Sequence, residues 1–523
     1  MGGLIALLSC TGPTPADEAP LLPADALLVR WSLDARGVRP SADELAAVRA
    51  NPAAVEAYLD EYLADPRFGD RVWTALSPAW LTRADESDSA DTTYSMDDEA
   101  GFVAAMGEEP LRLIGHVANE DLPYTDIVTA DWTMVNEQLA AWYPTDYPDG
   151  GVGWQVARWT DHRPAAGVLA TNGLWWRYPT TTGNANRGRA NAIGRILLCS
   201  DTTERSIELD ANADLTDADA VADAVSNNPS CVACHTSIDP LGSYLWGFYV
   251  EFSTNPADIT HYHPERERLW QTFGGGVAPA FYGAPGSTLA DLGRQIAADP
   301  RFPTCAVEQT TEILLQRPVA YADTDALAAH REAFIQGGGT VRALWRAVMS
   351  SAEYRTLPVS DPEGTTWKMV TPDQYVTQLT DLTGWTFTAG GADVFAEDRY
   401  GLRSMAGGGR AVFGTGAGLD PTPTMTLVHQ RLAEAAAAHV TATDHADPGA
   451  ARLFEAADFD ATTPAEARVR ALVLRVLSRD ATDEEIATLS TLWTELYTTE
   501  EGAEGAWAGV LATLFRHPDF LFY

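Results

Sequence analysis

The chain has 523 residues, a formal net charge of −38 and a hydrophobic content of 46%. Such a negative charge excludes a general nucleic-acid binder, because the phosphate backbone would be repelled. The hydrophobic content, together with 16 Trp and 17 Tyr residues, excludes an intrinsically disordered chain. The length predicts about three or four domains.

The first ten residues are typical of a bacterial lipoprotein export signal. A short apolar run, Leu4–Leu8, leads into Cys10, and Leu7-Leu8-Ser9-Cys10 matches the lipobox motif. Cys10 would then be lipidated, and residues 11–24 would form a Pro-rich tether. The run is short and no basic residue precedes it, so a frayed apolar terminus with a free thiol is the alternative. The prediction is an exported periplasmic or cell-surface lipoprotein that meets the membrane through its lipid anchor.

Helical periodicity predicts a first module over residues 24–71. Its second helix is expected to begin near Ser41, because acidic residues follow in what would be the first turn. Residues 301–355 and 463–523 show the same plan of an apolar helix ending at an arginine, an acidic-capped second helix, and an aromatic stop. We interpret the three stretches as repeated helical units. The alternative is that any well-capped helical hairpins would align equally well.

Between the first two modules the sequence changes character. Residues 85–98 are acidic and predict a surface loop. Helices are predicted from Glu109 and from Ala130. Residues 150–194 are rich in Gly, Trp and Arg, show little helical periodicity, and predict short strands and loops.

The most informative motif is Cys231-Val-Ala-Cys234-His235. This spacing attaches c-type haem, because two thiols three positions apart can both add to the haem vinyl groups. His235 then becomes the proximal ligand of the iron. Residues 236–242 are predicted as a turn in which a backbone carbonyl accepts the Nδ1–H of His235, which would leave Nε2 for iron. The sequence therefore predicts covalent haem c.

Three alternatives compete with haem at this motif. Cys231 and Cys234 could form a local disulfide or redox pair, although no thioredoxin-like pattern surrounds them. They could join Cys199 and Cys305 in an all-thiolate zinc site. The motif could also be structural and carry no cofactor. If Cys10 is lipidated and the motif holds haem, Cys199 and Cys305 remain, and they either pair in a disulfide or stay free.

The second axial ligand of the iron decides between electron transfer and ligand chemistry. The candidates are His261 and His263, in a loop, and Met349, on an apparent amphipathic helix. Each has an ordinary alternative, since loop histidines are often solvated and a helical methionine often packs in a core. An iron with an open sixth position is the remaining alternative.

Three stretches carry a family resemblance: residues 109–169, residues 186–242 with the Cys231 motif and its Ile-Asp-Pro-Leu-Gly tail, and residues 299–354. They resemble successive domains of secreted, cytochrome-c-like proteins known mainly from planctomycetes and myxobacteria. The resemblance implies an exported protein and supports the haem interpretation. It implies no reaction, because the domains of that family have no established function.

The expected fold is mainly α and multi-domain, with repeated helical modules around a c-type-haem-like central domain and some short strands. The expected divisions are a signal peptide at 1–10, a tether at 11–24, an N-terminal helical module at 25–95, a helical and loop/strand domain at 96–185, the cytochrome-c-like domain at 186–300, a helical module at 301–358 and a C-terminal helical domain at 359–523.

The expected function is electron transfer by an exported haem c protein, as a redox subunit of a membrane-associated assembly. Its partner would be a redox protein or a surface complex. One alternative is a haem enzyme with an open distal site. The other is a cell-surface binding or scaffold lipoprotein with a structural Cys-x-x-Cys-His motif, in which Trp154, Trp159, Trp175 and Trp176 would contact polysaccharide. No catalytic residue is identified.

Overall fold

The computed structural model describes residues 20–83, 98–204, 216–250, 255–357, 360–361, 364–365, 367–389, 392–398, 400–408, 418, 421–499 and 502–523. Within these residues the protein is mainly α-helical with a few short strands, as the sequence predicts. Cys10, its lipobox and most of the tether lie outside the described residues. No helix in the described ranges is long and apolar enough to cross a membrane.

The N-terminal module consists of α1 (Ala24–Arg36), α2 (Ala42–Ala50), the short η1 (Pro52–Ala54), α3 (Val55–Leu63) and α4 (Arg67–Trp80). Helix α2 begins where the sequence predicts. The Ser41 side chain accepts a hydrogen bond from the Glu44 backbone N–H, and the Glu44 carboxylate accepts one from the Ser41 N–H at 2.6 Å. This reciprocal capping satisfies two donors that the first turn leaves free.

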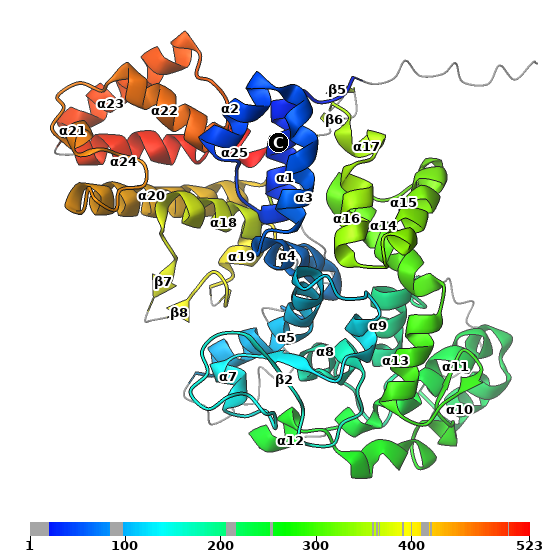
Figure 1. Ribbon diagram of the computed structural model, residues 1–523. Helices are drawn as coiled ribbons and strands as arrows, with labels where there is room; N and C mark the ends of the chain where they lie inside the picture. Colours follow the sequence, from blue (N-terminus) through cyan, green and yellow to red (C-terminus); the bar gives the residue numbers. More distant parts are fainter. Residues whose placement is uncertain are drawn as a thin grey trace, which may run out of the picture.

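The second and third modules repeat this arrangement (Figure 1). The second contains α14 (Arg301–Leu315), η6 (Tyr321–Asp323), α15 (Thr324–Gln336), α16 (Val341–Met349) and α17 (Ala352–Arg355). The third contains α22 (Glu466–Leu477), α23 (Asp483–Thr499), α24 (Ala503–Leu514) and α25 (Pro518–Leu521).

The same local features recur in all three modules. Each first helix ends at a residue with left-handed backbone: Gly37 (φ 72°), Gln316 (φ 51°) and Ser478 (φ 59°). An arginine next to that residue pairs with the acidic residue that opens the second helix: Arg36–Glu44, Arg317–Asp323 and Arg479–Glu485. The last helix of each module buries an aromatic ring completely: Phe68 in α4, Tyr354 in α17 and Phe520 in α25. These shared features support the predicted repetition.

An Asp-Pro-Arg-Phe sequence starts α4 and also α14, with the same geometry each time. Asp65 accepts from the backbone N–H of Arg67 at 2.9 Å and pairs with its guanidinium at 2.6 Å. Asp299 makes the same contacts with Arg301, at 2.8 and 2.6 Å. A carboxylate at a helix N-terminus meets the free N–H groups and the positive end of the helix dipole, which fixes the start of both helices.

The middle of the chain begins with the long helix α5 (Glu99–Asn119), which packs along α4. It continues through α6 (Asp126–Thr129), β1 (Thr133–Val135), α7 (Glu137–Ala140), β2 (Gln155–Ala157), η2 (Gly167–Ala170), α8 (Asn172–Arg177) and α9 (Arg187–Leu198). Strands β1 and β2 pair antiparallel. The prediction of strands and loops over 150–194 is therefore right for β2 but wrong for α8 and the start of α9, where packing against α5 and α14 stabilises helices of weak periodicity.

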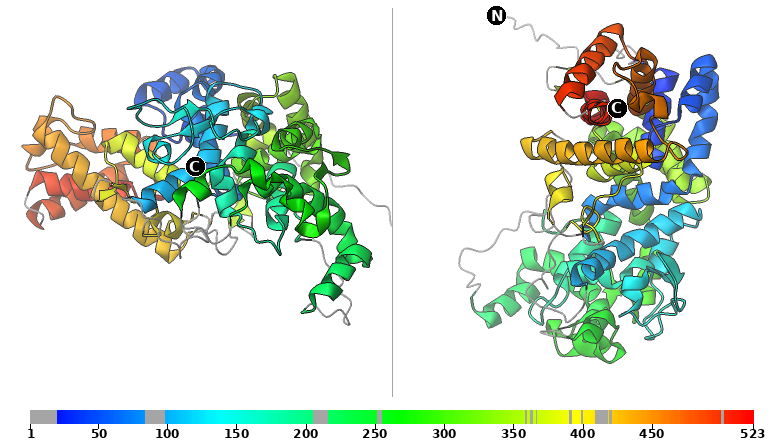
Figure 2. Two further views of the ribbon diagram at one scale, coloured as in Figure 1. Left: turned by 90° about the horizontal axis from the view of Figure 1, so that it is seen from below. Right: turned by 90° about the vertical axis from the view of Figure 1, so that its left-hand side faces the viewer.

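The segment that carries the Cys231 motif follows α9. It contains α10 (Ala218–Asn227), α11 (Pro229–Gly242), η3 (Ser243–Phe248), α12 (Pro256–Thr260), η4 (Pro264–Gln271), η5 (Gly274–Gly276), the hairpin β3 (Ala280–Phe281) and β4 (Ala284–Pro285), and α13 (Leu289–Ala298). Helices α10 and α11 lie at the edge of the molecule (Figures 1 and 2).

Between the second and third modules lie β5 (Ser360–Asp361), β6 (Gly364–Thr365), α18 (Pro372–Thr383), β7 (Thr388–Ala389), β8 (Ala392–Asp393), α19 (Leu402–Met405), α20 (Pro423–Ala446) and α21 (Ala456–Phe459). Helix α20 packs along α24 and against α18, and the three form one side of the C-terminal part (Figures 1 and 2).

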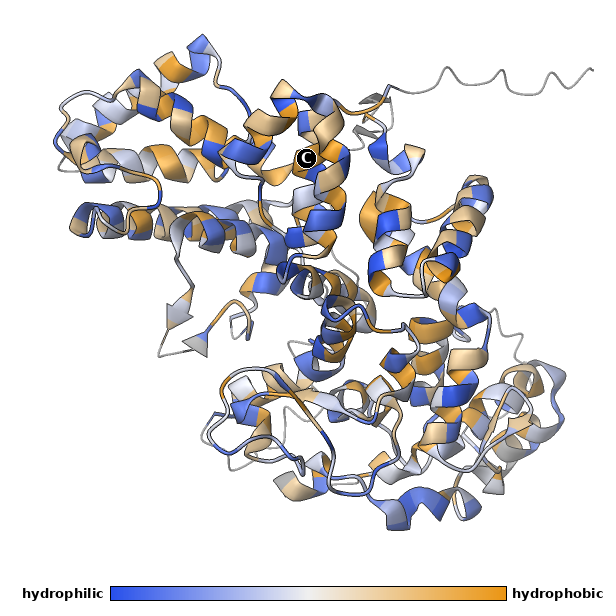
Figure 3. Ribbon diagram, viewed as in Figure 1, coloured by the Kyte–Doolittle hydropathy of each residue, from blue (hydrophilic) through white to orange (hydrophobic). Residues whose placement is uncertain are grey.

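Buried apolar side chains form two large cores in the described residues. One joins the N-terminal module, the middle segments and the second module, and contains Trp31, Trp175 and Trp345. The other fills the C-terminal part and contains Trp493 and Trp507. Figure 3 shows apolar and polar residues alternating along the helices of these cores. Helix α1 contributes to both cores, because Leu33 faces the second while most of its apolar residues face the first.

A buried polar cluster connects the three modules where α1 lies between the two cores. The carboxylate of Asp34 accepts hydrogen bonds from the hydroxyls of Tyr354 at 2.5 Å and Tyr523 at 2.7 Å, and it pairs with the ammonium group of Lys368. Lys368 is the single lysine of the chain, and its backbone pairs with that of Tyr523. Asp34, Tyr354 and Lys368 come from three different segments, so this cluster fixes how those segments meet.

Candidate functional site

Helix α11 holds the whole Cys-x-x-Cys-His motif. It begins at Pro229, and the side chain of Asn228 accepts a hydrogen bond from the Ser230 N–H. In a helix, residues three and four positions apart share a face, so Cys231 lies beside both Cys234 and His235 on consecutive turns. The regular helix thus produces the juxtaposition that the spacing predicts.

The two motif cysteines are free thiols of intermediate exposure. The other described pair, Cys199 and Cys305, forms a disulfide that links the end of α9 to α14, with Cα atoms 5.2 Å apart. Of the two alternatives left open for Cys199 and Cys305, the structure shows the disulfide. The alternative of a four-thiolate zinc site is wrong, because two of its four ligands are bonded to each other. No group of three or more potential metal ligands occurs in the described part of the chain.

His235 is oriented by a carboxylate of its own helix. Its Nδ1 lies 3.0 and 3.1 Å from the two carboxylate oxygens of Asp239, one turn further on. Arg187 of α9 donates two hydrogen bonds to the same carboxylate, at 2.7 and 3.2 Å. Burial alone would raise the pKa of Asp239, but the hydrogen bonds from His235 and Arg187 outweigh it and hold that pKa below its ordinary value.

This geometry corrects the prediction of a turn at residues 236–242. The helix continues to Gly242 with Pro240 inside it, so no turn carbonyl reaches His235. The i,i+4 spacing places the Asp239 carboxylate there instead. Because an ionised carboxylate only accepts, Nδ1 is the protonated nitrogen of the neutral imidazole, and that tautomer leaves the lone pair on Nε2. Within the described residues that nitrogen makes no hydrogen bond, so it is available as a metal ligand.

The predicted distal ligands lie in different surroundings. Both ring nitrogens of His263 are engaged, Nε2 with the backbone oxygen of Asp258 at 2.7 Å and Nδ1 with Glu265 at 3.2 Å. His261 is engaged at Nδ1 by the hydroxyl of Thr260.

Met349 lies on α16, in the large core of the first two modules. It is fully buried, and its carbonyl accepts a hydrogen bond from the Trp31 indole at 3.0 Å. Helix α16 packs against α3, α5, α14 and α15, whereas α11 packs against α9, α10, η3 and β3. The structure thus places Met349 as a packing residue of another module and does not bring it to the motif.

The four tryptophans considered for polysaccharide contact do not form one exposed surface. Trp175 is buried, and its indole donates to the carbonyl of Leu169. Trp159 is covered by the guanidinium of Arg163 at 3.3 Å, and Trp176 packs edge-on against Phe102. Trp154 and Trp176 are partly buried beside the same small core. The contacts of these four tryptophans are packing contacts within the protein.

Asp239 and Arg187 are the site residues that the sequence reasoning missed. The first had a usable signal, because His-x-x-x-Asp in a helix places the two side chains on one face. The second had none, since only the packing of α9 against α11 brings Arg187 to Asp239.

Comparison with protein-family models matches residues 42–144 to PSD4, described as a protein of unknown function (DUF1592). The matched segment runs from α2 through α7 and includes Glu109. No curated protein and no solved structure matches the chain. The matched family thus supports an uncharacterised domain in the first part of the chain, and its description mentions neither haem nor electron transfer.

Proposed function

We propose that this protein carries one covalently bound haem c on α11 and serves in electron transfer outside the cytoplasm. The observation that carries the proposal is the arrangement of two free thiols and an oriented imidazole on one helix, while the other two described cysteines are paired. The donor set suits the group: Cys231 and Cys234 would form the thioether bonds and Nε2 of His235 would ligate the iron. When bound, haem supplies reversible one-electron exchange.

The disulfide supports the proposed location outside the cytoplasm. Disulfides persist in oxidising compartments and are rare where thiols are kept reduced. Covalent haem attachment and a Cys199–Cys305 disulfide are both features of exported proteins, which agrees with the lipoprotein signal predicted from the sequence. The expected partner is a redox protein or surface complex at the membrane.

A haem spectrum is the direct test. In a host that performs c-type maturation, we expect the wild-type protein to retain one haem after denaturation, with the α-band of a c-type pyridine haemochrome. The Cys231→Ser/Cys234→Ser variant should lose all covalent haem. Thr236→Ala is a matched control, because its hydroxyl bonds only the Val232 carbonyl in the same helix, and it should retain haem. A folded wild-type protein without haem would contradict the proposal.

The contact between Asp239 and His235 predicts a low reduction potential. A carboxylate that accepts from Nδ1 makes the imidazole a stronger donor, which favours the ferric iron. Hydrogen bonds to ionised groups are roughly twice as strong as neutral ones, so Asp239→Asn is expected to raise the potential by about 40–90 mV, or about 1–2 kcal/mol.

Redox titration and resonance Raman spectroscopy check this expectation. The iron–histidine stretching frequency should fall together with the rise in potential. Asp223→Asn, on the neighbouring α10, removes the same charge without touching His235 and should change neither quantity by a comparable amount. An unchanged potential in Asp239→Asn with haem still bound would show that the carboxylate only supports the helix.

A second candidate is a haem protein with an open sixth position. The engagement of both His263 nitrogens and the burial of Met349 in another module favour it. Carbon monoxide distinguishes the two, because it binds a reduced haem with an open position and is excluded from one with two tight protein ligands. Rapid formation of a CO complex would favour ligand or peroxide chemistry over simple electron transfer.

A further inference from the structure

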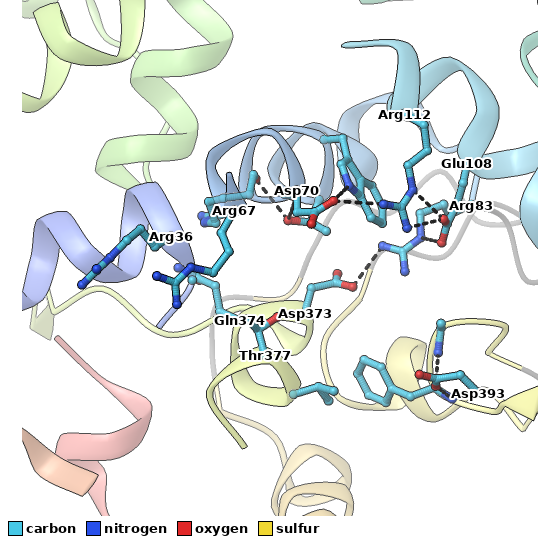
Figure 4. A pocket seen from close by; sticks show the side chains of 17 residues that line it. Arg36, Arg67, Asp70, Arg83, Glu108, Arg112, Asp373, Gln374, Thr377 and Asp393 are labelled. Atoms are coloured by element: carbon cyan, nitrogen blue, oxygen red, sulfur yellow. Dashed lines mark hydrogen bonds and ion pairs between the residues drawn. The ribbon is translucent and has the colours of Figure 1, made fainter. Parts of the chain in front are cut away.

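A second candidate site lies far along the chain from α11, in a cavity of about 260 Å³ between α4, α5, α18 and residues 393–396. Its lining is unusually rich in charge (Figure 4). Five arginines contribute to it: Arg36, Arg67, Arg71, Arg83 and Arg112. They come from α1, α4, α5 and the segment after α4, so the cavity exists only in the folded protein.

Four of these arginines are already paired with carboxylates, and three of them also lie over an aromatic ring, Arg36 over Tyr62 at 3.7 Å and the other two over Trp73. The closest ion pairs are Arg36–Glu44 at 3.3 Å, Arg67–Asp65 at 2.6 Å, Arg83–Asp373 at 3.1 Å and Arg112–Asp70 at 2.9 Å. The guanidinium groups of Arg83 and Arg112 lie 4.8 and 4.2 Å from the centre of the Trp73 ring. These contacts give the cavity walls a fixed form.

Arg71 is different. Its side chain is nearly buried, with 4% of the residue exposed, yet within the described residues its guanidinium makes neither a hydrogen bond nor an ion pair. Nε and Nη1 are both buried without an acceptor. Arg71 has the charge of Asp34 nearby and the Trp345 ring 6.0 Å away, but neither gives its Nε and Nη1 a hydrogen bond, and burying N–H donors without an acceptor is costly. An acceptor is therefore missing at this place.

The charged groups near Arg71 are a second argument for an anionic ligand. Asp34 is the one carboxylate of the buried cluster, and it is already engaged by Lys368 and two tyrosines. Arg30 adds another buried positive charge and donates only to backbone carbonyls. Burial lowers the pKa of Lys368 to about 8, and the charges of Arg30 and Arg71 act in the same direction. Three buried cations thus face one carboxylate.

We propose that this cavity binds a small anionic ligand whose carboxylate or phosphate group pairs with Arg71. A guanidinium presents planar N–H pairs that match both groups. The volume admits a small organic acid or phosphate ester and is below the range usual for drug-sized ligands. The acidic side chains that also line the cavity, Asp70, Glu108 and Asp373, are paired with arginines and would accept further hydrogen bonds from hydroxyl or amino groups of the same ligand. The site is independent of haem.

Isothermal titration calorimetry with inorganic phosphate and with succinate tests the proposal. We expect saturable binding of at least one of them to the full-length protein, and binding at least about tenfold weaker in Arg71→Met, since a charge-assisted pair contributes about that much. Arg294→Met is the matched control, because that arginine is exposed on α13 and lies outside the cavity. All titrations use the same ionic strength. Binding of phosphate alone identifies a phosphate ligand, and binding of succinate alone identifies a carboxylate.

Two results would overturn the proposal: no binding of either anion by the wild type up to about 10 mM, or equal binding by wild type and Arg71→Met. Should Arg71→Met fail to fold, the wild type still decides. Phenylglyoxal modification of Arg71, followed by peptide mapping, should slow at least about tenfold in saturating anion, while modification of Arg294 should not. Equal rates with and without the anion would count against the site.

Discussion

Replacing Asp34 with asparagine is expected to lower the free energy of unfolding by about 3–5 kcal/mol, because it leaves buried cations without their carboxylate. Asp34 is 1% exposed and is the acceptor for Lys368, Tyr354 and Tyr523. Burial alone would raise the pKa of Asp34, yet Lys368 and the other cations nearby hold it below its ordinary value, so the carboxylate is charged. Urea unfolding at neutral pH measures the loss.

A series of variants separates the contribution of the Asp34 charge to stability from the contribution of its hydrogen bonds. Tyr523→Phe removes one donor and should cost less, about 1–2 kcal/mol, because the ion pair persists. Glu332→Gln, on the exposed face of α15, should change the stability by less than about 0.5 kcal/mol. A loss below about 1 kcal/mol in Asp34→Asn would mean that water or the neighbouring arginines adjust to the change.

The second large effect on the free energy of unfolding is expected from removing the Cys199–Cys305 disulfide. The Cys199→Ala/Cys305→Ala variant is expected to lose about 2–5 kcal/mol, since the bond closes a loop with a sequence separation of 106 residues. That loop contains α10 and α11, so we expect the loss in the unfolding transition of the segment that carries the Cys231 motif. Thermal unfolding followed by circular dichroism would measure it.

Reduction provides an independent check on the disulfide. Dithiothreitol should lower the unfolding midpoint of the wild type toward that of the variant and leave the variant unchanged. The Cys231→Ser/Cys234→Ser protein keeps the disulfide, so its response to dithiothreitol should match that of the wild type. Equal midpoints for oxidised and reduced wild type would show that α9 and α14 hold together without the bond.

The two candidate sites occupy different parts of the fold and are proposed for different chemistry. The motif on α11 lies at the edge of the molecule, as electron exchange with a partner requires (Figure 1). The arginine-lined cavity lies where the N-terminal module meets α18, and Arg71 in its lining acts electrostatically on Asp34 and Lys368. Much of its lining, Arg67 to Arg112, falls within the segment that matches the family of unknown function. An anion-binding role would be a first functional property to test for that domain.

Much of the secondary structure follows from short-range patterns. Ser41 with Glu44, Asp65 with Arg67, and Asp299 with Arg301 are local pairs whose spacing alone fixes where helices start. The repeated modules were predicted from a recurring order of an apolar helix ending at an arginine, an acidic-capped second helix and an aromatic stop. The loops and strands expected over residues 150–194 failed for α8 and α9, because contacts with distant helices outweigh weak local preference there.

The sequence by itself determined the helices with clear caps and identified Cys231, Cys234 and His235 as one motif, since those relations span no more than four residues. Tertiary structure alone decided the disulfide between Cys199 and Cys305 and the hydrogen bonds from Arg187 to Asp239. It alone also brought Lys368 and Tyr523 into contact with Asp34. It also created the cavity around Arg71. Each of these contacts joins residues at least 52 positions apart, and only the packing of whole helices brings such distant side chains together.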